Sequence, residues 1–464
     1  MSQALKPYSS YKTAKMPWLD QIPSHWDEKR AKYFFREVDE RSQTGEEELL
    51  SVSHKTGITP RSEKNVTMFK AESYVGSKLC KPGDIVINTM WAWMAALGVS
   101  NHAGIVSPAY GVYRPLEEGA YSRLFLDNLL RTRSFVSEYI CRSTGIRSSR
   151  LRLYPDQFLR IPFVYPPKEE QGIIEKYLRA KTTQIAKFIK AKRKLIALLN
   201  EQKQAIINQA VTRGLDANVR LKPSGVDYLG DIPEHWEVRR LKYLVNNVNN
   251  QTATKAPDEK YIALEHVESW TGAICYPDGD ISFESLVKQF TPDDVLFGKL
   301  RPYLAKVAFP KCRGVCVGEF LVFRCHDEKL IPCFLENKLR SFSIIDLVNS
   351  STYGAKMPRA DWTFIGNLFF SYPDKSEQQQ IVDGIKEKTS KLNAAIASLQ
   401  NEIDLIREYR TRLISDVVTG KLDVRGIEVE EVDASEVLGD HDEAEENTFT
   451  EEAEEAEEDL SDND

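Results

Sequence analysis

Two stretches of this sequence combine arginine or lysine with hydroxyl-bearing residues and glycine. The first is CRSTGIRSSRLR at 141–152, and the second is SSTYGAKMPRA at 350–360. Guanidinium groups can read guanine edges through paired hydrogen bonds, while hydroxyl groups and glycine amides hold phosphates. We therefore expect both stretches to contact DNA. The candidate residues are Arg142, Thr144, Arg147, Ser148, Ser149, Arg150, Arg152, Tyr353, Lys356 and Arg359.

A second pair of stretches offers similar chemistry. FGKLRPYLAK at 297–306 is basic, whereas its counterpart NTMWAWMAA at 88–96 is not, although it carries polar side chains that can hydrogen-bond to bases. Trp91 and Trp93 in that counterpart are expected to pack in the core. The alternative for each basic stretch is a solvated loop without a ligand, and two equivalent basic stretches disfavour it. The candidate contacts here are Asn88, Thr89, Lys299, Arg301 and Lys306.

Catalytic motifs are missing from the sequence. It has no G-x-x-x-x-G-K-[ST] phosphate loop, no G-x-S-x-G elbow, no H-E-x-x-H helix and no Asn-Pro-Pro-Tyr or Asp-Pro-Pro-Tyr tetrad. Four cysteines and a histidine between 312 and 333 lack C-x-x-C pairs, which favours buried thiols over a zinc site. The triplet 336–338 resembles half of a nuclease motif but falls on a predicted helix face. We expect neither catalytic residues nor a metal site.

The candidate stretches belong to an internal repeat. The phrase IPSHWDEKRAKY at 22–33 returns as IPEHWEVRRLKY at 232–243, an offset of 210 residues. Two further pairs share that offset, so the chain contains two copies of one domain of about 150 residues. These pairs are KPGDIVI at 81–87 with TPDDVLF at 291–297, and GIVSPAYGVYRP at 104–115 with GVCVGEFLVFRC at 314–325.

Each copy is predicted to be a mixed α+β domain. Short apolar runs at 85–87 and 295–297 follow turn-forming residues and predict strands, as do 112–113 and 321–323. Apolar residues recur at helical spacing in 127–140 and in 333–348. The copies diverge strongly between their matching segments, which indicates one scaffold that carries two different surfaces.

A long helix is predicted after each copy. YPPKEEQGIIEKYL at 165–178 matches YPDKSEQQQIVDGI at 372–385, now at an offset of 207. Apolar residues then recur every seven residues in the same register in both copies, which predicts a coiled coil, with Lys192 interrupting the seam. Gly214 and Gly420 are the expected C-terminal stops. The seam positions are Leu178, Ile185, Ile189, Ile196, Leu199, Ile206 and Ala210 in the first copy, and Ile385, Leu392, Ile396, Leu399, Ile403, Ile406, Leu413 and Val417 in the second.

The net charge of −7 conceals two oppositely charged parts. Residues 427–464 contain 19 Asp or Glu and no Lys or Arg, which leaves 50 acidic against 62 basic residues and a net charge of +12 in residues 1–426. A basic body suits a nucleic-acid partner. The tail at 427–464 is expected to be disordered. The chain lacks an apolar run of 18 residues, and its seven cysteines show no disulfide pattern, so we expect a cytoplasmic location.

These features together resemble the specificity subunits of type I restriction–modification systems. The resemblance rests on LDQIPSHW and LGDIPEHW opening the copies, on PPKEEQ and PDKSEQ opening the helices, and on AVTRGLD and VVTGKLD closing them. It implies a first target-recognition domain at 16–168, a central spacer helix at 169–213, a second recognition domain at 214–374 and a C-terminal spacer helix at 375–423. The spacers would pair as an antiparallel coiled coil in a pseudo-twofold molecule.

The resemblance also implies partners and cofactors. Each recognition domain would read one half of a split site in double-stranded DNA. Two methyltransferase subunits would bring S-adenosylmethionine, and two motor-nuclease subunits would bring ATP and Mg²⁺. The acidic tail and the first fifteen residues depart from the family pattern. Two alternatives remain open, namely a coiled-coil repeat adaptor that does not bind DNA, and a methyltransferase or nuclease whose motifs escape recognition.

Overall fold

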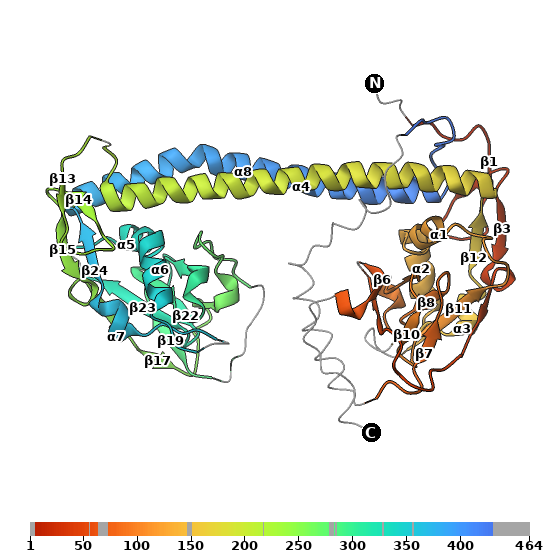
Figure 1. Cartoon of the computed structure of the whole chain (residues 1–464), viewed down its shortest axis with the longest axis horizontal. Coiled ribbons are helices and arrows are strands. Elements are labelled where there is room, and N and C mark those ends of the chain that lie inside the picture. The colour runs from red at the N-terminus through yellow and green to blue at the C-terminus, as the bar shows by residue number, and fades with distance from the viewer. Residues whose placement is uncertain are drawn as a thin grey trace. The chain divides into compact units, whose positions relative to one another are not determined.

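The structure, a computed structural model, describes residues 5–54, 56–63, 73–145, 151–216, 218–277, 283, 285–326, 329–354 and 357–429. The chain forms two compact units (Figure 1). The first unit contains the chain up to Ala191 and from Glu402 onward, and the second contains Lys192–Asn401. Two long helices, α4 (Lys168–Arg213) and α8 (Lys375–Val418), each contribute to both units.

Each unit contains a four-stranded antiparallel sheet of the same design. The predicted strands are present in both sheets, and matching strands lie about 210 residues apart, which confirms the duplication. The first sheet has the order β4 (Phe35–Glu37), β11 (Gly111–Pro115), β8 (Ile85–Ile87), β9 (Leu97–Val99), and the second has the order β16 (Val245–Val248), β23 (Phe320–Cys325), β20 (Asp294–Gly298), β21 (Val307–Ala308).

The two copies differ in their smaller sheets. Among the described residues, the first unit has four two-stranded sheets, whereas the second has two such sheets and a second four-stranded sheet. The pairs of the first unit are β1 (Tyr11–Thr13) with β2 (Gln21–Pro23), β3 (Asp27–Arg30) with β12 (Pro162–Tyr165), β5 (Leu50–Ser53) with β6 (Gly57–Pro60), and β7 (Lys78–Cys80) with β10 (Gly104–Val106). In the second unit, β13 (Leu221–Pro223) pairs with β14 (Asp231–Pro233) and β15 (Glu237–Arg240) with β24 (Phe369–Tyr372), while the extra sheet runs β17 (Gln251–Thr252), β19 (Val287–Phe290), β22 (Gly314–Cys316), β18 (Lys260–Ile262).

The helical stretches predicted at 127–140 and 333–348 are each divided in two. The first unit has α1 (Arg123–Leu130) and α2 (Arg133–Arg142), and the second has α5 (Pro332–Leu339) and α6 (Phe342–Ser350). Thr132 and Ser341 adopt extended backbone angles at the breaks, and the Thr132 hydroxyl donates to the Leu129 carbonyl. The spacing of apolar residues does not predict the break between the two helices, because buried residues continue at helical spacing on both sides of it. A short helix follows later in each copy, α3 (Pro155–Phe158) and α7 (Trp362–Asn367).

The repeated His-Trp pair binds the opening segment of each copy to a long helix. Trp26 Nε1 donates to Glu170 Oε1 at 3.1 Å, and His25 Nε2 lies 2.7 Å from Glu170 Oε2. In the second unit, the corresponding distances to Glu377 are 3.1 Å from Trp236 and 2.7 Å from His235. The repeated phrase at the start of each copy therefore contacts the repeated phrase at the start of a long helix in the same unit.

The glutamine after each of these glutamates adds a second fastening. Gln171 accepts from the Ser122 amide at 2.8 Å and donates to the Ala120 carbonyl at 3.2 Å. Gln378 likewise accepts from the Ile331 amide at 3.0 Å and donates to the Lys329 carbonyl at 2.7 Å. Each amide holds the segment that leads into the helix pair of its own copy.

The two long helices pair antiparallel, as predicted. In the first unit, the start of α4 packs against the end of α8 through Leu178 and Val417, and in the second unit the end of α4 packs against the start of α8 through Ile207 and Ile385 (Figure 1). All the predicted seam positions are buried or half-buried. The heptad pattern therefore identified the contact faces correctly.

The ends of the helices and the start of the tail differ in part from prediction. Helix α4 ends at Arg213, as expected, whereas α8 ends at Val418 rather than at 423, because Gly420 adopts the left-handed conformation with φ 77°. Ile427 and Val429 pack against the core of the first unit, so the expectation of disorder is wrong for 427–429. The rest of the tail lies outside the described residues. The predicted domain boundaries remain a prediction. Across the described residues, no helix is long and apolar enough to cross a membrane.

Candidate nucleic-acid interface

In the second unit, the two predicted basic stretches form one platform. The Arg301 amide donates to the Pro358 carbonyl at 2.8 Å, and the Ala360 amide donates to the Lys299 carbonyl at 2.8 Å. Tyr353 and Arg359 exchange backbone hydrogen bonds of 3.3 and 3.1 Å, which close the second stretch into a loop. The loop after β20 and the loop after α6 are therefore joined through their backbones. We call the described residues of these two loops, 299–306 and 351–360, the second platform.

The exposed cations of this platform have different surroundings. Arg301 is exposed, and among the described residues no hydrogen bond or ion pair involves its side chain. Arg359 is held by Glu319, with Nη2 3.1 Å from Oε1. Lys299 is half-buried near Asp361, whose pKa is lowered mainly by a hydrogen bond from Thr363 and further by this lysine. Arg301 is thus the side chain best placed to bind a ligand.

Lys306 has an internal role at the end of the same loop. Its Nζ donates to the Leu264 carbonyl at 2.7 Å, and burial lowers the pKa of the ammonium group. This contact holds the loop to the short helical turn at 264–266. Its proposed contact with DNA remains a prediction, and the geometry favours Arg301 over it.

The first unit builds a platform of the same design. Thr144 and Arg152 exchange backbone hydrogen bonds of 3.0 Å each, and the Leu153 amide donates to the Thr89 carbonyl at 2.9 Å. The Arg152 side chain is exposed and lies 4.0 Å from Met90 Sδ. We call the described residues 88–96, 142–145 and 151–153 the first platform. The pairing of the two loops recurs at the same repeat positions in both units.

The remaining polar residues of the first platform are bound internally. Asn88 is buried, donates to the Tyr110 hydroxyl at 3.2 Å and accepts from the Met90 amide at 3.2 Å. Thr89 Oγ1 donates to the Ala109 carbonyl at 3.0 Å, and Arg142 pairs with Glu138. These contacts shape the loops but leave few free donors.

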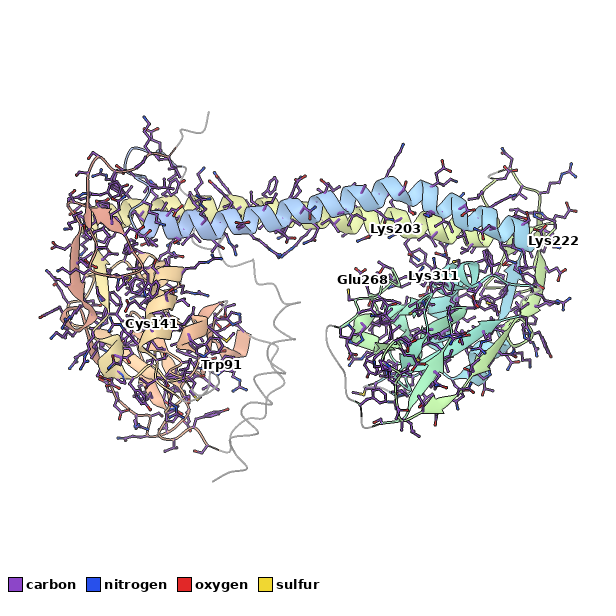
Figure 2. The ribbon with its side chains drawn as sticks, turned by 180° about the vertical axis from the view of Figure 1, so that it is seen from behind. Trp91, Cys141, Lys203, Lys222, Glu268 and Lys311 are labelled. Atoms are coloured by element: carbon purple, nitrogen blue, oxygen red, sulfur yellow. The ribbon has the colours of Figure 1, made fainter. Side chains whose placement is uncertain are left out.

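The two tryptophans differ from expectation. Trp91 and Trp93 are both half-buried rather than packed in the core. Trp91 lies in the loop that follows β8 (Figure 2), at the repeat position that Arg301 occupies in the second unit. The copies therefore present an aromatic and a cationic side chain on equivalent loops.

Five of the predicted contacts cannot be placed. They are Arg147, Ser148, Ser149, Arg150 and Lys356, and they lie outside the described residues. The described residues that flank them form the backbone pairs Thr144–Arg152 and Tyr353–Arg359. Their contacts with DNA remain predictions.

Exposed apolar side chains on and next to the platforms were missed by the sequence reasoning. Tyr303 is 45% exposed, Met357 is 53% exposed and Tyr154 is 49% exposed. Aromatic side chains in basic loops can stack on bases or pack against thymine methyl groups. The alternation of Tyr303 with Arg301 and Lys306 in the sequence was a usable indication of this surface.

The predicted cysteine cluster contains separate thiols. Cys316 and Cys325 are buried in β22 and β23, and burial raises the pKa of Cys316 to about 12. Cys312 and Cys333 are half-buried. Within the ranges that the structure describes, no group of three His, Cys, Asp or Glu side chains is arranged to hold a metal ion.

Sequence comparison finds two curated relatives, while no protein-family profile matches the chain. The type I restriction enzyme EcoDI specificity subunit of Escherichia coli is 20% identical over 200 residues, which cover 42% of this chain and 44% of that protein. The MjaVIII specificity subunit of Methanocaldococcus jannaschii is 23% identical over 313 residues, which cover 62% of this chain and 67% of that protein. The chain thus matches less than half the length of the first relative.

Structure comparison finds the same architecture. A solved chain from work on complex assembly and conformational transition of the type I R-M system superposes with a TM-score of 0.55 at 15% identity, covering 86% of this chain and 99% of that chain. At this identity the likeness concerns the fold. The resemblance predicted from the repeated phrases is thereby confirmed: the chain is similar in sequence to specificity subunits of type I restriction enzymes, and in fold to a solved chain of a type I restriction–modification system.

Proposed function

We propose that this chain selects the DNA sequence on which a type I restriction–modification enzyme acts. In this proposal it binds a bipartite, asymmetric target in double-stranded DNA, with one half-site on each platform. The chain itself performs no chemistry, and its selectivity comes from side chains that differ between two copies of one scaffold.

The doubled platform is the observation that carries this proposal. Each unit joins the loop after its central strand to the loop after its helix pair through backbone hydrogen bonds at matching positions. The side chains on that common backbone differ, with Arg301 in one unit and Trp91 in the other. A common backbone that carries different side chains in the two units suits two half-sites of different sequence. The net charge of +12 on residues 1–426 suits a DNA partner.

The proposal includes catalytic partners. Two methyltransferase subunits would bring S-adenosylmethionine and methylate adenine at N6, and two motor-nuclease subunits would bring ATP and Mg²⁺. The names of the two curated relatives, both specificity subunits of restriction enzymes, support such an assembly. In this proposal the methyltransferase subunits dock on the long helices, because each helix contributes to both units.

The test is to map methylated adenines in cells that carry the assembled enzyme. We expect a split target, with half-site centres about one helical turn (~10 bp) apart, because two equivalent readers then face the same side of the duplex. One contiguous, ungapped target would contradict the proposal. An adaptor that does not bind DNA would leave the methylation pattern unchanged when this chain is deleted.

A further inference from the structure

The repeated opening phrase contains three exposed residues that the fold does not require. Seven of its twelve positions are identical between 22–33 and 232–243. Four of these, namely Ile, Pro, His and Trp, are accounted for by burial or by the pairing with glutamate. The other three are Arg30, Lys32 and Tyr33 in the first copy and Arg240, Lys242 and Tyr243 in the second.

All six of these side chains are exposed, and the two tyrosines are 62% and 60% exposed. A further cation precedes them in each copy, Lys29 or Arg239. We call the four residues of each copy the basic–tyrosine patch. The surrounding copies have diverged strongly, so the survival of an exposed set in both indicates a shared task.

Internal contacts do not explain that survival. In the second unit, Lys242 Nζ donates to Asn367 Oδ1 at 2.8 Å, and Arg240 Nη1 donates to the same atom at 3.4 Å. The first unit has Arg160 at the position of Asn367, and an arginine cannot accept these bonds. The contact that both copies share is the lysine over the tyrosine ring, at 5.2 Å and 5.4 Å, and it lies at the surface.

Nearby acidic groups leave most of the patch charge available. Lys29 lies 3.9 Å from Asp27, and Arg239 lies 3.4 Å from Glu237, and such exposed pairs are weak. Among the described residues, no carboxylate lies within ion-pair distance of the other two cations of either patch. Glu117 is an additional acidic residue near the first patch, because it lines a surface hollow together with Lys29 and Tyr33.

In both units, the patch contacts the short helix that follows the platform. The Lys32 amide donates to the Leu159 carbonyl at the end of α3, and Lys242 contacts the last residue of α7. Helices α3 and α7 begin two or three residues after the platform loops close. A six-residue helix such as α7 is about 9 Å long at ~1.5 Å per residue, comparable to the ~12 Å width of the major groove.

We infer that the two basic–tyrosine patches bind the DNA phosphate backbone beside each half-site. The inference rests on the proposed function, because it assumes that the platforms face DNA. The phosphate backbone is the same at both half-sites, whatever their base sequences. A partner that does not vary explains why the patch is unchanged between the copies while the platforms have diverged. The clustered cations complement the charge of phosphate.

The test removes the four shared cations in the full-length chain, co-purified with its methyltransferase subunits. The variant carries Arg30→Ala, Lys32→Ala, Arg240→Ala and Lys242→Ala. Its affinity should fall by the same factor for target and non-target duplexes, with an unchanged methylated sequence. The slope of log affinity against log salt should decrease by about three to four, since each lost phosphate contact removes ~0.9.

A charge-matched control replaces four exposed cations outside the platforms, the patches and the long helices by alanine, namely Lys6, Arg123, Arg220 and Lys311. A patch variant that matches this control in affinity and in salt slope would overturn the inference while leaving the proposed function intact. A variant that binds DNA normally but no longer co-purifies with the methyltransferase subunits would also overturn it, because the patch would then dock protein. A wild-type assembly without salt-dependent DNA binding would contradict the proposed function itself.

Discussion

Arg301 holds an unusual backbone conformation for its residue type. Its φ is 51°, in the left-handed region that a residue with a Cβ rarely adopts, and Pro302 follows it directly. Such a conformation costs about 1–3 kcal/mol and persists where surrounding contacts impose it. Here the hydrogen bond from the Arg301 amide to the Pro358 carbonyl does so. The bond ties the second platform together and leaves the guanidinium group exposed.

Replacing Arg301 by alanine should therefore impair one half-site. We expect a loss of about 1–3 kcal/mol in binding and a relaxed preference at one position of the second half-site, as for a lost bidentate base contact. The change Arg152→Ala on the first platform should affect the first half-site instead. Binding of both variants to substituted half-sites, at several salt concentrations, provides the measurement. Wild-type behaviour of both variants would show that these side chains do not read DNA.

Lys338 is a buried cation that the first copy lacks. Its repeat counterpart is Leu129, which lies fully in the core. Lys338 Nζ donates to the Val211 carbonyl in the last turn of α4 at 2.7 Å and to Ser371 Oγ at 2.9 Å. Burial lowers the pKa of this ammonium group to about 7. The end of α4 is thus bound to α5 and β24 of the second unit through this lysine.

Stability should consequently rise with pH in a window set by Lys338. The unfolded lysine has a pKa of about 10.4, so between pH ~7 and ~10 the unfolded state binds more protons than the folded state. The free energy of unfolding should increase with pH by up to about 1.4 kcal/mol per unit in this range. The Lys338→Leu variant should lack that slope in urea unfolding. Equal slopes in both proteins would contradict the assignment.

At the scale of elements, a glycine in the left-handed conformation follows the end of each long helix. Gly214 and Gly420 have φ of 81° and 77°. A Cβ on Gly420 would collide with the Pro23 ring and approach Trp26 at 3.0 Å. The end of α8 is therefore fitted closely to the repeated opening phrase of the first copy.

Gly420→Ala should destabilise the first unit. The left-handed conformation costs an L-residue about 1–2 kcal/mol, and the collision with Pro23 adds to that cost. Gly426→Ala is the matched control, since a Cβ there meets nothing within 4 Å. Thermal unfolding should show a lower Tm for Gly420→Ala and an unchanged Tm for the control. Equal Tm values would show that the end of α8 is loosely packed.

At the scale of the whole molecule, charge divides the chain into a basic body and an acidic end. Residues 427–464 carry 19 acidic and no basic residues, against +12 for residues 1–426. An acidic segment repels phosphate, so we do not expect it to read DNA. Because it is tethered to a basic body, it should compete weakly with non-specific DNA.

Deleting residues 430–464 should leave the methylated sequence unchanged and raise non-specific DNA affinity at low salt. The gain should shrink as salt increases, because the Debye length falls from about 30 Å at 0.01 M to about 8 Å at 0.15 M. A tail of equal length with Asn and Gln in place of Asp and Glu should give the same gain as the deletion. A changed methylation target, or loss of folding, would show that the tail has a structural role.

Local patterns in the sequence determined the repeat architecture. The matching phrases placed the strands of both four-stranded sheets, and the heptads identified the seam of α4 and α8. Short apolar runs and heptad patterns record which residues of an element are buried, because the order of apolar and polar residues along a strand or helix is a local property of the sequence. The glycine stops were predictable for the same reason, since left-handed conformations favour glycine locally.

Tertiary structure alone decided which segments of each site meet. Lys299 and Ala360 are joined by a backbone hydrogen bond across 61 residues. The sequence predicts their two loops as separate DNA-contacting stretches. Glu170 and Glu377 were not singled out in the sequence, yet each binds a histidine and a tryptophan more than 140 residues away. Such pairings depend on how the chain folds back on itself. Residue type and spacing along the chain do not encode the pairing of the two loops, because backbone amides and carbonyls are common to all segments.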